Sequence, residues 1–165
     1  TDFSMVEEGN MMRINYSLSV NGYWCDSNRT VFVGKPDRED LAAYEANQKL
    51  VKFAETLLKP GTKISAFCKK IQQKAEIDEI QLLTDFGMGH GVGTSECEMP
   101  VLSADNQDTF KEGMVISMGL KTLGMKNEII LSSDIYLLTS NGYEKLSDFM
   151  NWDDLYLING VRSNH

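Results

Sequence analysis

The chain has 165 residues, enough for a single domain with a sizeable apolar core. Its formal net charge of −8 argues against proteins that bind nucleic-acid phosphates or anionic membrane surfaces, and no apolar run reaches the roughly 18 to 20 residues of a membrane span. The three cysteines are scattered and odd in number, which excludes a disulfide framework and favours a reducing, cytoplasmic location.

Two strands joined by a tight turn are the first predicted elements. Residues 11–20 have the composition of a strand, and Asn21-Gly22 is typical of a two-residue hairpin turn. Residues 23–33 form the predicted partner strand, which ends in β-branched and aromatic residues. Gly34-Lys35-Pro36 ends this strand, and Asp37 is suited to cap a helix that follows.

Two amphipathic helices come next. The first is predicted to run to about Leu58, where Lys59-Pro60-Gly61 ends it. Its apolar residues fall on one face at spacings of three and four: Ala43, Ala46, Leu50, Phe53, Ala54 and Leu57. The second helix is predicted over residues 63–75. It repeats this spacing with Ile64, Phe67 and Ile71.

Strands return after residue 80. The predicted segments are 87–93, 114–120, 127–133 and 134–139, and Asn141-Gly142 indicates a hairpin turn before 143–146. The last stretch, 148–165, either packs on the body or forms a short tail. With no linker in the chain, residues 1–165 are predicted to be one α+β domain. Its two helices cover one face of a largely antiparallel sheet.

Six short motifs occur in a fixed order along the chain. They are GYWCDSNRT with VGKP over 22–36, LKPG at 58–61, GHGVG at 89–93 with Glu98 and Pro100, EGMV at 112–115, DIYLLT at 134–139, and NGYE at 141–144. Together they resemble the pita-bread metallopeptidases, which include Xaa-Pro peptidases, methionine aminopeptidase and the metal-free creatinase. The resemblance implies a pita-bread fold, of which the chain covers only the second half. We therefore expect a homodimer or association with the missing N-terminal half.

The resemblance also implies five side chains around two divalent metal ions: two Asp, one His and two Glu. Asp26 stands at the second Asp position and His90 at the His position. Asn15 replaces the first Asp, and Gly119 and Ser133 replace the two Glu. Four carboxylates are thus reduced to one, which predicts that the metal pair is lost. We expect no metal and no other cofactor, and assign Asn15, Gly119 and Ser133 to a ligand-binding pocket.

Asp26, His90 and Cys97 are the candidate catalytic residues. Cys97 falls on a further pocket histidine of the family, so it either forms a thiolate–imidazolium pair with His90 or is an unreactive thiol. His90 is either catalytic or a residual structural histidine. Asp26 either binds one metal ion or a substrate amine, or it hydrogen-bonds within its turn or pairs with Arg29.

Three functional hypotheses follow. The leading one is a member of the family without metallopeptidase activity, whose role is to bind a peptide, a small molecule or a protein partner. The alternative is a metal-independent hydrolase or lyase of a small amide or amine compound, using His90 with Asp26 or Cys97. A third is a true metallopeptidase in which Glu128 supplies an acid through a shifted hairpin. Its separation of five residues from Ser133 disfavours this, because the two side chains then face opposite sides of a strand.

Overall fold

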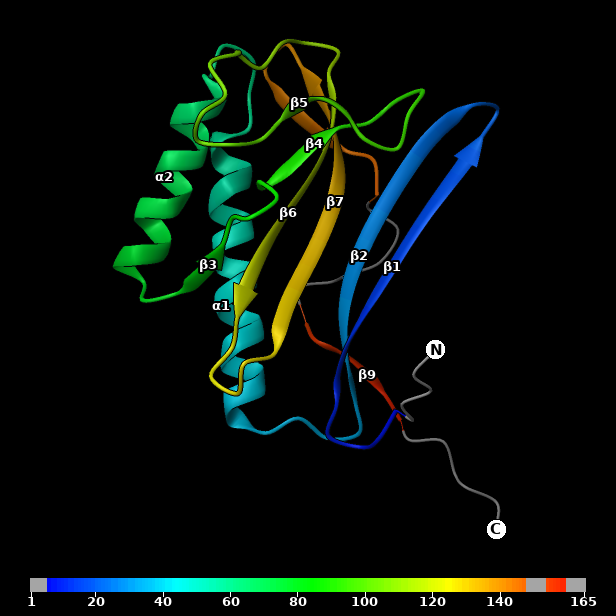
Figure 1. The fold of residues 1–165 in the computed structure, drawn as a ribbon, viewed down its shortest axis with the longest axis vertical. Coiled ribbons are helices and arrows are strands. Elements are labelled where there is room, and N and C mark those ends of the chain that lie inside the picture. Colours follow the sequence, from blue (N-terminus) through cyan, green and yellow to red (C-terminus); the bar gives the residue numbers. More distant parts are fainter. Residues whose placement is uncertain (1–5, 148–153, 160–165) are drawn as a thin grey trace.

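The computed structural model describes residues 6–147 and 154–159, which form one mixed sheet and two helices (Figure 1). The elements in chain order are β1 Met11–Val20, β2 Tyr23–Val33, α1 Arg38–Leu57, α2 Ile64–Ile77, β3 Gln81–Leu83, β4 Gly89–Gly91, β5 Glu98–Val101, β6 Val115–Leu123, β7 Ile129–Thr139, β8 Gly142–Lys145 and β9 Tyr156–Ile158. Neither described helix is long and apolar enough to span a bilayer.

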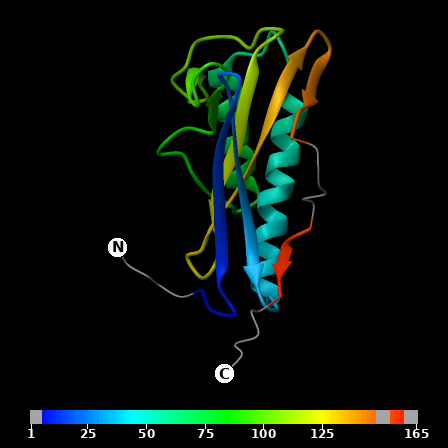
Figure 2. The same cartoon turned by 90° about the vertical axis from the view of Figure 1, so that its right-hand side faces the viewer.

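The sheet is almost entirely antiparallel. Its strand order is β1-β2-β7-β6-β4-β5, with β3 added on β6, β8 on β7 and β9 on β2, and only the β2–β9 pair is parallel. The α1 helix packs on β6 and β7, and α2 packs on α1 and β3, so both helices cover the same face (Figures 1 and 2). The β1–β2 hairpin extends beyond them. This arrangement confirms the predicted α+β class.

Local signals placed the first elements correctly. Asn21 and Gly22 have φ angles of 52° and 84°, as a two-residue hairpin turn requires, and the β1–β2 register continues from Val20 and Tyr23 to the far end of the hairpin. Asp37 caps α1, because its carboxylate accepts hydrogen bonds from the backbone N–H groups of Glu39 and Asp40. The hairpin and the cap are therefore both confirmed.

The main core lies between the helices and the sheet. Leu50, Ala54 and the three predicted α2 residues are completely buried there. The predicted face of α1 is partly wrong. Four of its members are only partly buried: Ala43, Ala46, Phe53 and Leu57. Tyr44, Asn47 and Val51 are buried instead. The buried Asn47 is accommodated because its amide donates to the Leu120 carbonyl and to the Thr122 hydroxyl.

The later strands differ from the prediction in several places, and β3 was not predicted at all. One continuous strand, β7, replaces the predicted pair 127–133 and 134–139, because Ser133 and Asp134 at its centre are buried and hydrogen-bonded. β4 is shorter than the predicted 87–93, and β5 was not predicted, since Pro100 argues against a strand. β9 packs on β2, as expected for part of the C-terminal stretch. Residues 148–153 and 160–165 lie outside the described residues.

Candidate functional site

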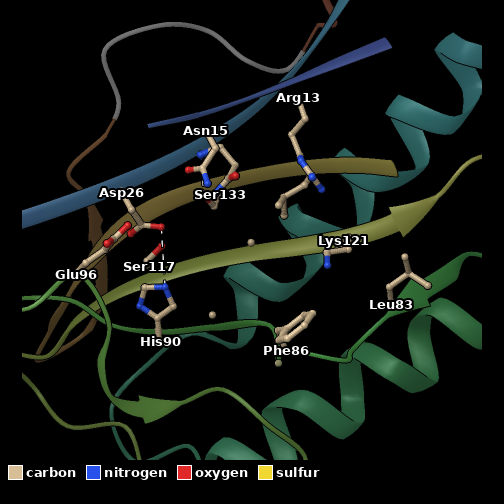
Figure 3. A pocket seen from close by; sticks show the side chains of 15 residues that line it. Arg13, Asn15, Asp26, Leu83, Phe86, His90, Glu96, Ser117, Lys121 and Ser133 are labelled. Atoms are coloured by element: carbon tan, nitrogen blue, oxygen red, sulfur yellow. Dashed lines mark hydrogen bonds and ion pairs between the residues drawn. The ribbon is translucent and has the colours of Figure 1, made fainter. Parts of the chain in front are cut away.

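A pocket of about 480 Å³ opens on the face of the sheet opposite the helices (Figure 3). On β6, Met118 and Leu120 belong to the core beneath the helices. Because side chains alternate along a strand, Ser117, Gly119 and Lys121 face the other side, where they line the pocket. Residues from β1, β2, β3, β4 and β7, together with loop residues on either side of β4, complete the lining.

The strand register arranges the pocket residues in rows. Asn15 on β1 lies opposite Asn28 on β2, Asn28 lies opposite Ser133 on β7, and Ser133 lies opposite Gly119 on β6. Three positions at which the family resemblance implies metal ligands therefore share one row. Asp26 lies two residues before Asn28 on β2. Its side chain is on the same face of the strand, so it lies in the neighbouring row.

Asp26 and His90 face each other across the pocket (Figure 3). Oδ2 of Asp26 lies 3.9 Å from Nε2 of His90, and the aspartate is only 8% exposed. Nδ1 of His90 lies 3.0 Å from the Gly91 carbonyl oxygen, which can only accept a hydrogen bond. Nδ1 therefore carries the hydrogen, and in the neutral ring Nε2 presents a lone pair to the carboxylate.

The other oxygen of Asp26, Oδ1, is buried and lacks a hydrogen-bond partner in the described part of the chain. A buried carboxylate oxygen without a donor is unfavourable. The Oδ1 and Oδ2 atoms of Asp26 and Nε2 of His90 thus place acceptors at one end of the pocket, a set that a positively charged donor group satisfies.

Arg29 does not pair with Asp26, so that alternative is wrong. Its guanidinium binds the carboxylate of Asp134 and the Ser133 carbonyl oxygen instead. The reason is strand alternation: residues 26 and 29 are three apart and point to opposite faces of β2. Asp26 consequently remains directed into the pocket.

Ser133 and Gly119 have structural tasks at the positions of the family's two Glu ligands. The Ser133 hydroxyl accepts from the backbone N–H of Asn28 at 2.9 Å and from its side-chain amide at 3.1 Å. These bonds join β2 to β7. A Cβ on Gly119 would lie 2.6 Å from the Ser133 Cβ, closer than two non-bonded carbon atoms approach. A side chain at position 119 therefore requires the two strands to shift.

Cys97 does not line the pocket, contrary to the expectation that it lies beside His90. It is exposed in the loop between β4 and β5. Glu96 lines the pocket instead, and its carboxylate accepts a hydrogen bond from the Ser17 hydroxyl. Glu98 holds the loop by accepting from the Ser95 backbone N–H at 2.7 Å, which lowers the pKa of Glu98. The proposed thiolate–imidazolium pair is not formed.

Sequence reasoning did not single out Arg13, Lys121 or Glu96 as pocket residues. A usable signal was present for the first two, because each lies two residues from a predicted pocket position and therefore on the same strand face. Arg13 precedes Asn15 on β1, and Lys121 follows Gly119 on β6. Glu96 comes from an irregular loop, for which the strand period gives no information.

The sequence profile of metallopeptidase family M24 matches residues 2–155. The chain belongs to this family. Over 152 residues it is 28% identical to a Xaa-Pro dipeptidase of Pyrococcus furiosus, covering 86% of this chain and 41% of that protein. The prolidase structure from Pyrococcus furiosus superposes with a TM-score of 0.79 at 27% identity, covering 88% of this chain and 43% of that chain.

A likeness of fold extends to a second kind of peptidase. The structure of methionine aminopeptidase from Thermotoga maritima gives a TM-score of 0.74 at 19% identity, over 86% of this chain and 65% of that chain. These matches confirm the pita-bread fold and the predicted family. The chain spans less than half the length of the Xaa-Pro dipeptidase that it matches.

The described residues of the pocket do not include the two Asp and two Glu side chains that the family resemblance implies for a pair of divalent ions. Within residues 6–147 and 154–159, no group of three or more His, Cys, Asp and Glu side chains is placed to hold a metal. Asp26, His90 and Glu96 share the pocket with neutral Asn15 and Ser133, and Arg13 and Lys121 bring positive charge to it. Glu128 does not supply the missing acid, because it precedes β7 and does not line the pocket.

Proposed function

We propose that this chain is a ligand-binding member of the M24 family that does not act as a metallopeptidase. Its pocket binds the amino group of a peptide or small molecule at Asp26 and His90. The observation that carries this proposal is the buried Asp26 carboxylate, with Oδ1 lacking a partner among the described residues and Oδ2 3.9 Å from Nε2 of His90.

A protonated amine suits this set of acceptors on chemical grounds. An ammonium group has three donors and no acceptor, so it can donate to the Asp26 carboxylate and to a neutral imidazole nitrogen at once. Its charge also compensates the buried aspartate, which is otherwise costly to leave without a counter-ion. The similarity to Xaa-Pro dipeptidases supports a peptide as the source of the amine.

The second candidate is a metal-independent hydrolase or lyase. It is favoured by the orientation of His90, whose Nε2 lone pair faces the pocket and can accept a proton from a bound substrate. Asp26 would then stabilise the imidazolium that forms. Cys97 takes no part in this candidate, because it is exposed outside the pocket.

Metal content and peptide binding together test the proposal. Protein purified without chelator should contain far less than one equivalent of divalent metal, and should bind the tripeptide Ala-Ala-Ala without cleaving it. Asp26→Asn should weaken that binding, whereas the exposed Asp108→Asn, which removes the same charge, should not. Two tightly bound divalent ions would contradict the proposal, and cleavage of the peptide by metal-free protein would favour the second candidate.

The cellular location is part of the proposal. Cys25, Cys68 and Cys97 are all free thiols. Burial raises the pKa of the Cys68 thiol to about 12, so this cysteine is protected from oxidation as well as unpaired. Three unpaired thiols in one small domain support a reducing, cytoplasmic environment.

A further inference from the structure

The pocket has a second charged end, formed by Arg13 and Lys121. Lys121 on β6 lies opposite Leu131 on β7, and Arg13 on β1 lies opposite Thr30 on β2. Both cations lie two residues beyond the row of Asn15, Ser133 and Gly119, on the side away from Asp26. In Figure 3 their side chains lie at one end of the pocket, and Asp26, Glu96 and His90 lie at the other.

Neither Arg13 nor Lys121 forms a direct ion pair with a carboxylate within the described part of the chain. The Lys121 amine lies 5.3 Å from the centroid of the Phe86 ring, a cation–π contact that leaves its hydrogen-bond donors available. The pocket therefore presents two unpaired cationic groups to whatever it binds.

The two ends of the pocket are close enough together for one ligand to reach both. Four residues along a strand separate the row of Asp26 from the row of Arg13, which is about 13 Å at the usual rise per residue. Arg13 and Lys121 have long side chains, which can take up part of this distance. An extended peptide of two or three residues, roughly 7 to 10 Å long, fits the remaining distance.

We propose that Arg13 and Lys121 bind the carboxylate of a zwitterionic ligand whose amine occupies the Asp26 end. This inference rests on the proposed function, because it takes the amine site as given. A carboxylate is favoured over a phosphate by charge. Asp26 and Glu96 already balance the two cations, so a ligand with one positive and one negative group leaves the pocket neutral, whereas a phosphate dianion adds excess negative charge.

Three forms of one peptide test this assignment: Ala-Ala-Ala, its C-terminal amide and its N-acetyl derivative. Binding is measured by NMR titration for the unmodified protein, for Arg13→Gln and for Lys121→Gln. Amidation, or either substitution, should weaken binding by about tenfold to a hundredfold, the range for losing a hydrogen bond to a charged group. Arg13→Lys should retain binding to the free acid. Lys70→Gln, an exposed change of the same charge on α2, should leave it unchanged.

The outcomes separate this inference from the proposed function. If Arg13→Gln and Lys121→Gln bind the free acid and the amide as the unmodified protein does, while N-acetylation still weakens binding, the carboxylate site is wrong and the amine site stands. If the unmodified protein binds none of the three peptides, both are wrong. If Lys70→Gln weakens binding equally, the effect is one of net charge and the carboxylate site is again wrong.

Discussion

Gly119 and Ser133 stand opposite each other on β6 and β7, and a Cβ on Gly119 would lie 2.6 Å from the Ser133 Cβ. The resemblance to the peptidases implies a glutamate at each of these positions. Here the two strands approach so closely that position 119 has no room for a side chain beside Ser133. The backbone is thus adapted to glycine at position 119, and a glutamate placed there alone would clash with Ser133.

Gly119→Ala should destabilise the protein by about 1 to 3 kcal/mol, because the new methyl group overpacks the contact with Ser133. Urea unfolding measures the loss. Ser133→Gly removes the clashing Cβ and serves as the second arm of a double-mutant cycle. The two substitutions together should be less destabilising than the sum of the single changes by about 1 kcal/mol. Strict additivity would show that the two residues are not in steric contact.

Arg29→Met should be destabilising by about 1.5 to 3 kcal/mol, because it removes a charged hydrogen-bond donor from the buried Asp134 carboxylate, which keeps Lys145 and Ser147 as partners. Lys74→Met is the matched control. It breaks an i,i+4 ion pair with Asp78 on α2, which is far more accessible to solvent, and should change the free energy of unfolding by less than about 1 kcal/mol. Equal losses in the two variants would contradict the account of Arg29 as a buried anchor.

Asp134 should make stability depend on pH in the acid range. Burial raises the pKa of Asp134, but Arg29 and hydrogen bonds from Lys145 and Ser147 lower it more, so the folded-state pKa lies below the usual value. Its contribution is therefore fully present above the ordinary Asp range and is lost as pH falls through the folded-state pKa. Asp134→Asn should show a shallower loss of stability on acidification. The same slope in both proteins would exclude this role.

The sequence predicted the elements that depend on neighbouring residues. The β1–β2 hairpin follows from Asn21-Gly22, and the α1 start follows from Asp37. The predictions that failed concern residues whose hydrogen-bond partners lie far away in the sequence. An asparagine in a helix is typical of the surface, yet the side-chain amide of Asn47 is buried and donates hydrogen bonds to Leu120 and Thr122. The polar residues at the centre of β7 suggested a break between two strands, because their partners on other strands are distant in the sequence.

The predictions for the candidate site were likewise correct for some residues and wrong for others. Asp26, His90, Asn15, Gly119 and Ser133 all line one pocket, because the strand register that the family resemblance implies is kept. The assumed position of Cys97 depended on an irregular loop, and the sequence does not determine where such a loop directs its side chains. Arg13 and Lys121 were overlooked because a charged residue on a strand suggests solvent exposure unless the opposite wall of a pocket is known.

The isolated chain should form a homodimer through β1. Among the described residues β1 pairs only with β2, so one edge of this ten-residue strand is open to another strand. Ile14, Leu18 and Val20 are exposed on its face away from the pocket, and Tyr23 lies opposite Val20. Sedimentation velocity should therefore show a dimer.

Leu18→Lys should shift this equilibrium to the monomer, because it places charge in the apolar contact. The control is Ile77→Lys at the end of α2, where an apolar side chain that is 76% exposed lies far from β1; it should leave the dimer intact. A folded, soluble monomer of the unmodified chain would contradict this prediction. So would a dimer that Leu18→Lys does not weaken, since the contact would then lie elsewhere.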